Sequence, residues 1–192
     1  EVALEEQAAS SLIETIQIKN KTYNIGLIII PSFYQDYQKK NKGESEYRST
    51  SEDVKKLVQN LVEIGIDALV IDLRDNGGGL LSEATALTGL FIDNGPILQL
   101  KDTRNKIEII DDPISGSIYE GPLAVVVNRF SASASEIFAG AIQDYSRGIV
   151  LGQQTFGKGT VQNLYQLDRY SRYESKKGFG QLTLTIGKFY RV

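Results

Sequence analysis

Three short segments of the sequence combine side chains and glycines that could carry out chemistry together. They are Arg74-Asp-Asn-Gly-Gly-Gly79, Ser131-Ala-Ser-Ala-Ser135 and Phe156-Gly-Lys-Gly-Thr160. A serine hydroxyl can attack a carbonyl carbon when a base removes its proton, and backbone N–H groups can hold the negative oxygen that forms. The three segments therefore indicate nucleophilic chemistry, provided that the fold brings them together.

The composition restricts which base could serve such a serine. The chain contains no Cys and no His. This excludes a Ser-His-Asp triad, a cysteine nucleophile, disulfides and any thiolate or imidazole metal site. The base of a hydrolase with this sequence must be a lysine, a carboxylate, a tyrosine or a terminal amine. A lysine base has to be desolvated, because a solvated amine is protonated at neutral pH.

Each segment also has a simpler interpretation. A serine at the start of a helix is often an N-cap, three glycines can form a tight turn, and Lys158 between Gly157 and Gly159 could be an ordinary surface lysine. Gly152 to Lys158 also matches the Gly-x-x-x-x-Gly-Lys pattern of a phosphate-binding loop. However, Gly159 stands where Ser or Thr should bind magnesium, and the β-prone residues 160–167 follow where a helix should begin. Nucleotide binding remains an alternative.

The hydrophobic pattern predicts that each segment follows a buried strand. Strands are predicted at 23–30, 68–73, 123–128 and 148–151, and helices at 54–64, 81–92 and 131–144. This alternation is typical of an α/β fold, in which ligands bind at the carboxyl ends of the strands. We therefore expect the three segments to converge on one crevice.

The remaining segments give weaker predictions. Residues 97–101 and 106–110 are expected to form a hairpin, and Leu182, Leu184 and Ile186 to lie on a final half-buried strand. Thr50 and Asp53 resemble a capping box, with Gly65 as the C-terminal cap of the same helix. Residues 35–51 are predicted to be a polar surface loop.

Length and composition indicate one domain over residues 1–192, with residues 1–22 as an irregular or strand-forming lead-in. The 192 residues are 41% hydrophobic and 23% charged, which is ordinary globular composition. A net charge of -3 gives no basic surface for nucleic acid. No apolar run approaches the roughly 18 residues of a membrane-spanning helix. Because the chain starts at Glu1 with no leader, we expect that any targeting segment has been removed or was never part of this sequence.

Taken together, the motifs resemble those of the C-terminal processing, or tail-specific, protease family of serine peptidases. The resemblance rests on Asp72-Leu-Arg-Asp-Asn-Gly-Gly-Gly79, Arg129-Phe-Ser-Ala-Ser-Ala-Ser-Glu-Ile-Phe138 and Thr155-Phe-Gly-Lys-Gly-Thr-Val-Gln162. It extends from about Tyr23 to Val192, and Gly187-Lys-Phe-Tyr-Arg191 matches the closing strand of the family.

The resemblance implies a role for each matching position. Ser133 is implied as the nucleophile and Lys158 as its base, with Gln162 orienting the lysine. The N–H groups of Gly79, or else Gly78, and of Ala134 are implied as oxyanion donors. The matching positions implied to be secondary supports are Glu136, Asp144 and Thr155.

The resemblance also implies a ClpP/crotonase-like core, an α/β fold with a mixed β-sheet flanked by helices. The implied reaction is endopeptidase cleavage of unfolded or C-terminally tagged polypeptides through an acyl-enzyme, without a cofactor. Members of the family usually carry a PDZ domain that captures substrate C-termini, and no such segment is visible in this sequence. Bacterial members usually work in the cell envelope, which implies a periplasmic location. A non-catalytic peptide-binding module of the same fold is the other alternative.

Overall fold

The computed structural model describes residues 7–36, 39, 42–43, 47–113, 115–171 and 178–192. The first half of the chain contains β1 (Ser10–Ile18), β2 (Lys21–Ile29), α2 (Thr50–Ile64), β3 (Ala68–Asp72), α3 (Leu81–Gly89), β4 (Pro96–Asp102) and β5 (Ile107–Asp111). The second half contains β6 (Leu123–Val127), α4 (Ala134–Asp144), β7 (Ile149–Gly152), β8 (Thr160–Gln166), the 3-10 helix η2 (Leu167–Tyr170) and β9 (Gln181–Tyr190). None of the helices in these ranges is long and apolar enough to cross a membrane.

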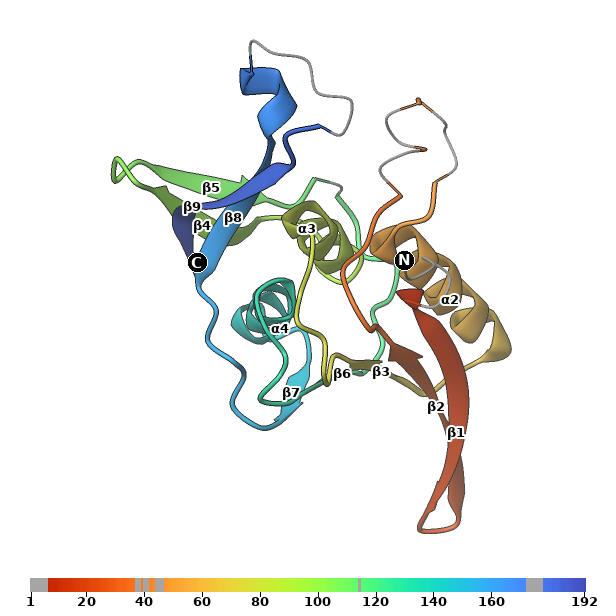
Figure 1. Ribbon diagram of the computed structural model, residues 1–192. Helices are drawn as coiled ribbons and strands as arrows, with labels where there is room; N and C mark the ends of the chain where they lie inside the picture. The colour runs from red at the N-terminus through yellow and green to blue at the C-terminus, as the bar shows by residue number, and fades with distance from the viewer. Residues whose placement is uncertain (1–6, 37–38, 40–41, 44–46, 114, 172–177) are drawn as a thin grey trace.

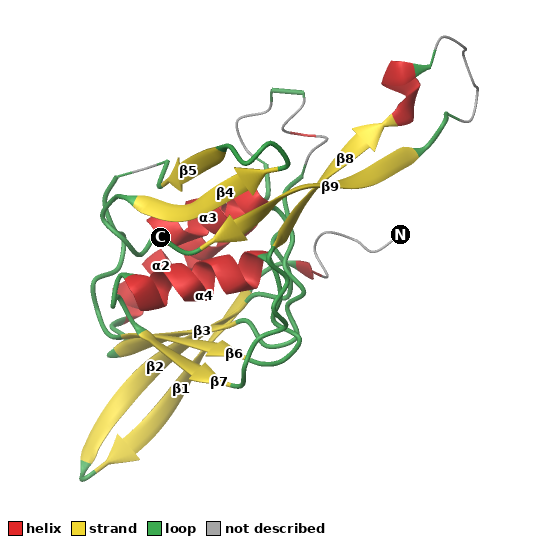
Figure 2. Ribbon diagram, turned by 90° about the vertical axis from the view of Figure 1, so that its left-hand side faces the viewer, coloured by secondary structure: helices red, strands yellow, loops and turns green. Residues whose placement is uncertain are grey.

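The elements form three layers, with the helices between two sheets (Figure 2). One sheet has five strands in the order β1-β2-β3-β6-β7, and the other has four strands in the order β5-β4-β9-β8. In the first sheet β1 is antiparallel to β2, whereas the other neighbours are parallel. This confirms the predicted α/β fold with a mixed sheet. The sequence did not reveal that the predicted hairpin and the final strand belong to a second, antiparallel sheet.

The core lies between the five-stranded sheet and the helices, and the parallel strands place alternate residues in it. The fully buried side chains of this layer include Ile28, Leu69, Ile71, Val125 and Phe138. Because the carboxyl ends of β3, β6 and β7 lie at one edge of the sheet, the loops that follow them start side by side. The fold thus brings the glycine, serine and lysine segments to the same end of the domain.

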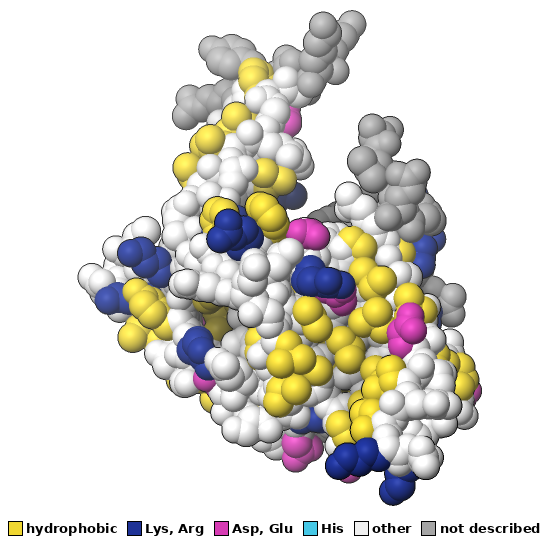
Figure 3. Space-filling view, turned by 90° about the horizontal axis from the view of Figure 1, so that it is seen from below, with side chains coloured by type: hydrophobic (Ala, Val, Ile, Leu, Met, Phe, Trp, Pro, Cys, Tyr) yellow, Lys and Arg dark blue, Asp and Glu magenta, His cyan; other side chains and the backbone are white. Residues whose placement is uncertain are grey.

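The other face of the five-stranded sheet is also apolar. Its partly exposed side chains include Leu27, Val70 and Val126, and at the edge of the sheet Ile149 and Leu151 are 59% and 49% exposed. The view from below shows hydrophobic side chains gathered over this side of the molecule (Figure 3). Within the described part of the chain, helices cover only the inner face of this sheet.

The hairpin of β8 and β9 extends away from the helices (Figures 1 and 2). The predicted final strand is confirmed as β9, but Leu182 and Leu184 are 43% and 46% exposed, so the prediction that they are half-buried on it was wrong. Both residues pair with β8 rather than with a strand over the core, which explains their exposure: Leu182 lies opposite Tyr165 and Leu184 opposite Asn163. Only Ile186, nearer the body of the domain, is partly buried.

Two local predictions need correction. The N-cap of α2 is Ser49, whose hydroxyl accepts from the Glu52 N–H, and not Thr50. The cap at Gly65 is confirmed, since this residue adopts the left-handed conformation. The predicted loop 35–51 is not wholly on the surface, because Gln35 and Ser49 are buried; residues 37–38, 40–41 and 44–46 of it lie outside the described residues.

The two other helices are shorter than predicted. α3 ends at Gly89 instead of residue 92, and the helix expected from Ser131 begins only at Ala134. The three residues before Ala134 form a turn that leads into α4, and this turn contains the candidate nucleophile.

Candidate active site

Ser133 is the residue immediately before α4, in a backbone conformation that serine rarely adopts. Its φ is 57° and its ψ is -113°. A non-glycine residue with positive φ is strained by roughly 1–3 kcal/mol, and such strain persists only where the surrounding structure imposes it. The turn places Ser133 at the positive end of the α4 dipole, next to N–H groups that have no partner within the helix. This is a suitable position for a nucleophile.

Asn76 connects the serine turn to the glycine segment. Its backbone oxygen accepts from the Ala132 N–H at 3.0 Å and from the Ser135 hydroxyl at 2.9 Å. Its side chain, which is fully buried, accepts from the Gly78 N–H at 2.8 Å and donates to the Ile30 oxygen at 2.7 Å. No role was predicted for Asn76 from the sequence, although its position directly before three glycines was an available signal.

The two implied oxyanion donors are available. No hydrogen bond between described residues uses the N–H of Gly79 or of Ala134. The Gly78 N–H, the other candidate, already donates to Asn76, which favours Gly79 over Gly78. Position 78 must be glycine, because a Cβ there would lie 2.8 Å from the Ser133 Cβ. This close contact brings the glycine segment directly against the serine.

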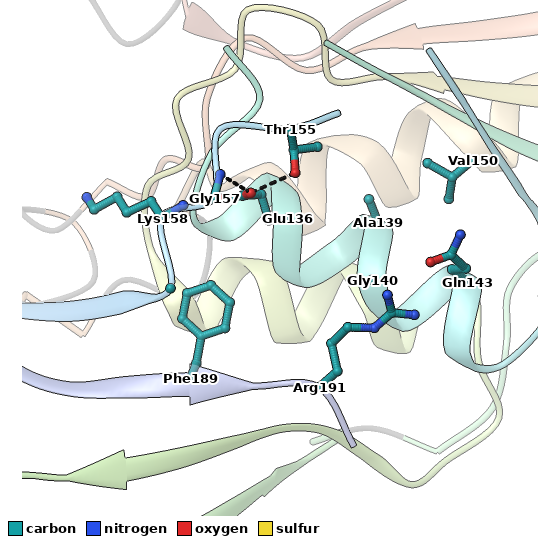
Figure 4. Close-up of a pocket in the computed structure, with 11 residues that line it drawn as sticks. Glu136, Ala139, Gly140, Gln143, Val150, Thr155, Gly157, Lys158, Phe189 and Arg191 are labelled. Atoms are coloured by element: carbon teal, nitrogen blue, oxygen red, sulfur yellow. Dashed lines mark hydrogen bonds between the residues drawn. The ribbon is translucent and has the colours of Figure 1, made fainter. Parts of the chain in front are cut away.

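The Glu136 carboxylate joins the serine turn to the lysine segment. One oxygen accepts from the Ser133 N–H at 2.7 Å and from the Lys158 N–H at 2.9 Å. The other accepts from the Thr155 hydroxyl and the Gly157 N–H, both at 2.7 Å (Figure 4). Hydrogen bonds to a charged acceptor are stronger than those between neutral groups. One side chain in the first turn of α4 thus fixes the backbone on both sides of the crevice.

The Lys158 side chain points away from Glu136 (Figure 4). It is partly buried, and none of the ion pairs among the described residues includes it. No carboxylate of the described residues therefore forms an ion pair with the Lys158 side chain.

A single cavity is lined by residues that the resemblance implies to be the nucleophile, the base, the oxyanion donors and the residue that orients the lysine. The cavity has a volume of about 480 Å³, and its lining includes Gly79, Ser133, Ala134, Lys158 and Gln162. The three predicted segments thus meet in a single crevice. Lys158 also borders a second cavity of about 320 Å³, which lies behind its loop between α4 and β9 (Figure 4).

The geometry does not support nucleotide binding by the Gly152–Lys158 loop. A phosphate-binding loop needs free N–H groups and a following helix. Here the N–H groups of Gly157 and Lys158 donate to the Glu136 carboxylate, and the next element is the strand β8. The N–H groups that would bind a phosphate are therefore already bound to the Glu136 carboxylate.

The remaining implied residues differ in their positions. Thr155 supports the lysine loop through Glu136. Gln162 lines the cavity, but its amide nitrogen donates to the Thr185 hydroxyl at 3.4 Å. Asp144 is at the far end of α4, about 17 Å from Ser133 along the helix, where it pairs with Arg191. Asp144 can thus support the end of β9 but does not reach the crevice.

Ser131 and Ser135 are structural residues. Both are fully buried, and each hydroxyl donates to a backbone oxygen: Ser131 to Leu73 at 2.7 Å and Ser135 to Asn76 at 2.9 Å. Of the three serines, Ser133 is therefore the one whose side chain lines the crevice.

An ion pair holds the end of β3, just before the glycine segment. Burial alone would raise the pKa of the Asp72 carboxyl, but hydrogen bonds from the Arg74 guanidinium and N–H lower that pKa below its ordinary value. Asp72 is therefore ionised at neutral pH, and it ties the chain at the point where β3 ends.

Comparison with known proteins gives a consistent result. Residues 24–192 match the family model described as peptidase family S41. The chain is 46% identical, over its whole length, to the tail-specific protease of Haemophilus influenzae, of which it covers 25%. It is 39% identical, over 62% of its length, to the chloroplastic carboxyl-terminal-processing peptidase 2 of Arabidopsis thaliana, of which it covers 24%. The chain thus spans about a quarter of the length of these relatives.

Solved structures show the same fold. The photosystem II D1 C-terminal processing protease matches 88% of this chain, and the match covers 38% of that protein, with a TM-score of 0.67 and 27% identity. Mature CPAF matches 94% of this chain and 46% of its own, with a TM-score of 0.69 at 16% identity, which supports the fold alone.

Glu136→Gln should loosen the lysine loop, because an amide has one acceptor oxygen where the carboxylate has two. We expect amide hydrogen exchange at Gly157 and Lys158 to become at least about tenfold faster, which corresponds to the loss of about 1.4 kcal/mol of protection. Asp144→Asn, at the other end of α4, is the matched control and should leave both amides protected. Unchanged exchange in Glu136→Gln would show that the carboxylate does not hold the loop.

Proposed function

The chain belongs to peptidase family S41, and from this premise we propose that it is the core of a serine endopeptidase with Ser133 as nucleophile and Lys158 as base. The observation that carries the proposal is the shared cavity. A strained serine at a helix N-terminus, a lysine that pairs with no described carboxylate, and two residues whose N–H groups no described residue uses all border the same space. The chain has no histidine, and Lys158 is the only basic side chain among the described residues that line the cavity.

The proposed reaction proceeds in two steps. Lys158 takes the proton of the Ser133 hydroxyl while the serine oxygen attacks the carbonyl carbon of a peptide bond. The N–H groups of Gly79 and Ala134 stabilise the resulting oxyanion. The proton then passes from Lys158 to the leaving amine, and an acyl-enzyme remains. A water molecule, deprotonated by Lys158, attacks the ester carbon and releases the acid product and Ser133.

Gln162 is proposed to orient the Lys158 amine. Its amide nitrogen is used by Thr185, but no hydrogen bond between described residues uses its oxygen. A lysine amine has only donors when charged, so the Gln162 oxygen is the atom that could accept from it.

The proposed substrate is an extended polypeptide that binds beside β8. This strand is at the edge of the four-stranded sheet, and residues 160–164 of it line the cavity. An edge strand has unpaired N–H and C=O groups that can pair with an added strand. A peptide bound in this way would pass Lys158 and Ser133.

The finer assignments rest on the family. Unfolded or C-terminally tagged substrates, their capture by a PDZ domain of a longer protein and a periplasmic location are proposed from the resemblance and from the bacterial relative. The alternative is a peptide-binding module of the same fold without catalysis, which peptide cleavage assays would distinguish.

Ser133→Ala should abolish cleavage of a fluorogenic peptide, with kcat/KM at least about a thousandfold lower. Ser131→Ala and Ser135→Ala are matched controls. Each removes a buried hydroxyl that donates to a backbone oxygen, so each should cost stability, by about 1 kcal/mol, more than activity. If Ser131→Ala alone abolished cleavage while Ser133→Ala remained active, the nucleophile would be assigned to the wrong serine.

Lys158→Arg should be as inactive as Lys158→Ala, because a guanidinium stays charged at every accessible pH and cannot accept a proton. Both variants should fold, since the Lys158 N–H, and not its side chain, donates to Glu136. The measurement is kcat for peptide cleavage together with the melting temperature. Near-normal kcat in Lys158→Arg would mean that this residue only positions the substrate.

A further inference from the structure

Glu83 is a buried carboxylate that the proposed reaction does not use. It is 3% exposed and lies in the first turn of α3, which begins two residues after Gly79. One of its oxygens accepts from the Gln35 side chain at 2.9 Å. The other accepts from the Ser51 N–H at 2.9 Å and from the Ser51 hydroxyl at 2.8 Å. Its hydrogen bonds thus tie α3 to two segments that are more than 30 residues away in the sequence.

These bonds fix the short segment that follows β2. The Tyr34 N–H donates to the Thr50 hydroxyl at 2.8 Å, and the Thr50 N–H donates back to the Tyr34 oxygen at 3.0 Å. Gln35 forms an isolated antiparallel β-bridge with Ser49, directly beside this pair. With Gln35 and Ser51 both bound to Glu83, residues 33–35 are held between the N-terminus of α2 and the first turn of α3.

The same segment contacts the backbone of the glycine segment on both sides of Gly79. The Phe33 N–H donates to the Gly78 oxygen, and the Leu80 N–H donates to the Phe33 oxygen, both at 3.0 Å. Gly79 itself is so close that a Cβ on it would lie 2.1 Å from the Phe33 oxygen. The Phe33 backbone therefore determines how the Gly78–Gly79 peptide is oriented.

This orientation decides where the Gly79 N–H points. The Gly78 oxygen and the Gly79 N–H belong to one peptide unit, and in a trans peptide they point in opposite directions. Because the oxygen faces Phe33, the N–H must face away from Phe33. Gly79 borders the cavity together with Ser133, and no described residue accepts from its N–H.

We propose that Glu83 is a positioning residue, which holds the Phe33 segment so that the Gly79 N–H stays aimed at the oxyanion. The inference rests on the proposed function. It adds that the oxyanion donor is held from outside the glycine segment, by a buried carboxylate that never touches the substrate. Without this support the Gly78–Gly79 peptide could rotate, because glycines have little steric barrier to other backbone conformations.

The test compares Glu83→Gln with Glu52→Gln in the complete polypeptide. Glu52 is an exposed neighbour at the N-terminus of α2, and no described hydrogen bond uses its carboxylate. We expect Glu83→Gln to lower kcat at least about tenfold, with KM changed by less than about twofold, because the lost interaction acts on the transition state. Glu52→Gln should match the unaltered protein in both constants.

A second readout separates positioning from a general loss of structure. A peptide aldehyde places its oxygen in the oxyanion position after the Ser133 hydroxyl adds to it, whereas the matching peptide acid does not. In Glu83→Gln the aldehyde should bind more weakly by about the factor lost in kcat, while binding of the acid stays unchanged, both measured below the melting temperature. Equal weakening of both ligands, or unchanged kcat, would overturn the proposal.

Two milder variants serve if Glu83→Gln does not fold. Gln35→Ala and Ser51→Ala each remove one donor from the carboxylate, and each should lower kcat with KM unchanged. Normal kcat in both would overturn the proposal. If the unaltered protein showed no cleavage that depends on Ser133, the proposed function and this inference would both fail. If the unaltered protein showed such cleavage and the variants had the same kcat, the inference alone would fail.

Discussion

The geometry of the crevice depends most on the hydrogen bonds that the Glu136 carboxylate accepts. This carboxylate accepts hydrogen bonds from the serine turn on one side and from the lysine loop on the other. Its position in the first turn of α4 is favourable for a negative charge, because the N-terminal end of the helix dipole is positive. The lysine loop has few other anchors to the serine turn, one being the Phe156 N–H to the Ser131 oxygen at 3.0 Å. The position of Lys158 relative to Ser133 is thus set largely by one side chain.

Two further polar residues fix the glycine segment, which contains the proposed oxyanion donor Gly79, in the same way. Asn76 holds the serine turn against the glycine segment, and the Glu83 network holds the glycine segment against residues 33–35. Each residue is buried and forms hydrogen bonds with several groups, so each makes the backbone around it more rigid. The parallel strands bring the loops to one edge of the sheet, and these three side chains then fix the loops in place. A strained Ser133 can persist because its neighbours leave it no other conformation.

The sequence predicts the elements well and the contacts between them poorly. The helix at 54–64 and the strands of the parallel sheet follow from periodicity and from Gly65, which are local signals. The sequence identified Glu136 only as a supporting residue, by resemblance, because its partners in the lysine loop lie 19 to 22 residues further along the chain. Asn76 and Glu83 were missed, since their roles depend on partners 32 to 59 residues away. The exposure of β9 was also missed, because alternation predicts which residues share a face but not what covers that face.

The most direct test of this account is labelling of the folded protein by a fluorophosphonate probe, with the modified residue identified by mass spectrometry. Such a probe reacts with an activated serine and not with a hydroxyl that merely caps a helix. The account predicts a single label on Ser133, strongly reduced in Glu136→Gln because the lysine loop is then no longer held beside the serine. Labelling of a different serine, or no labelling of the folded protein, would contradict it.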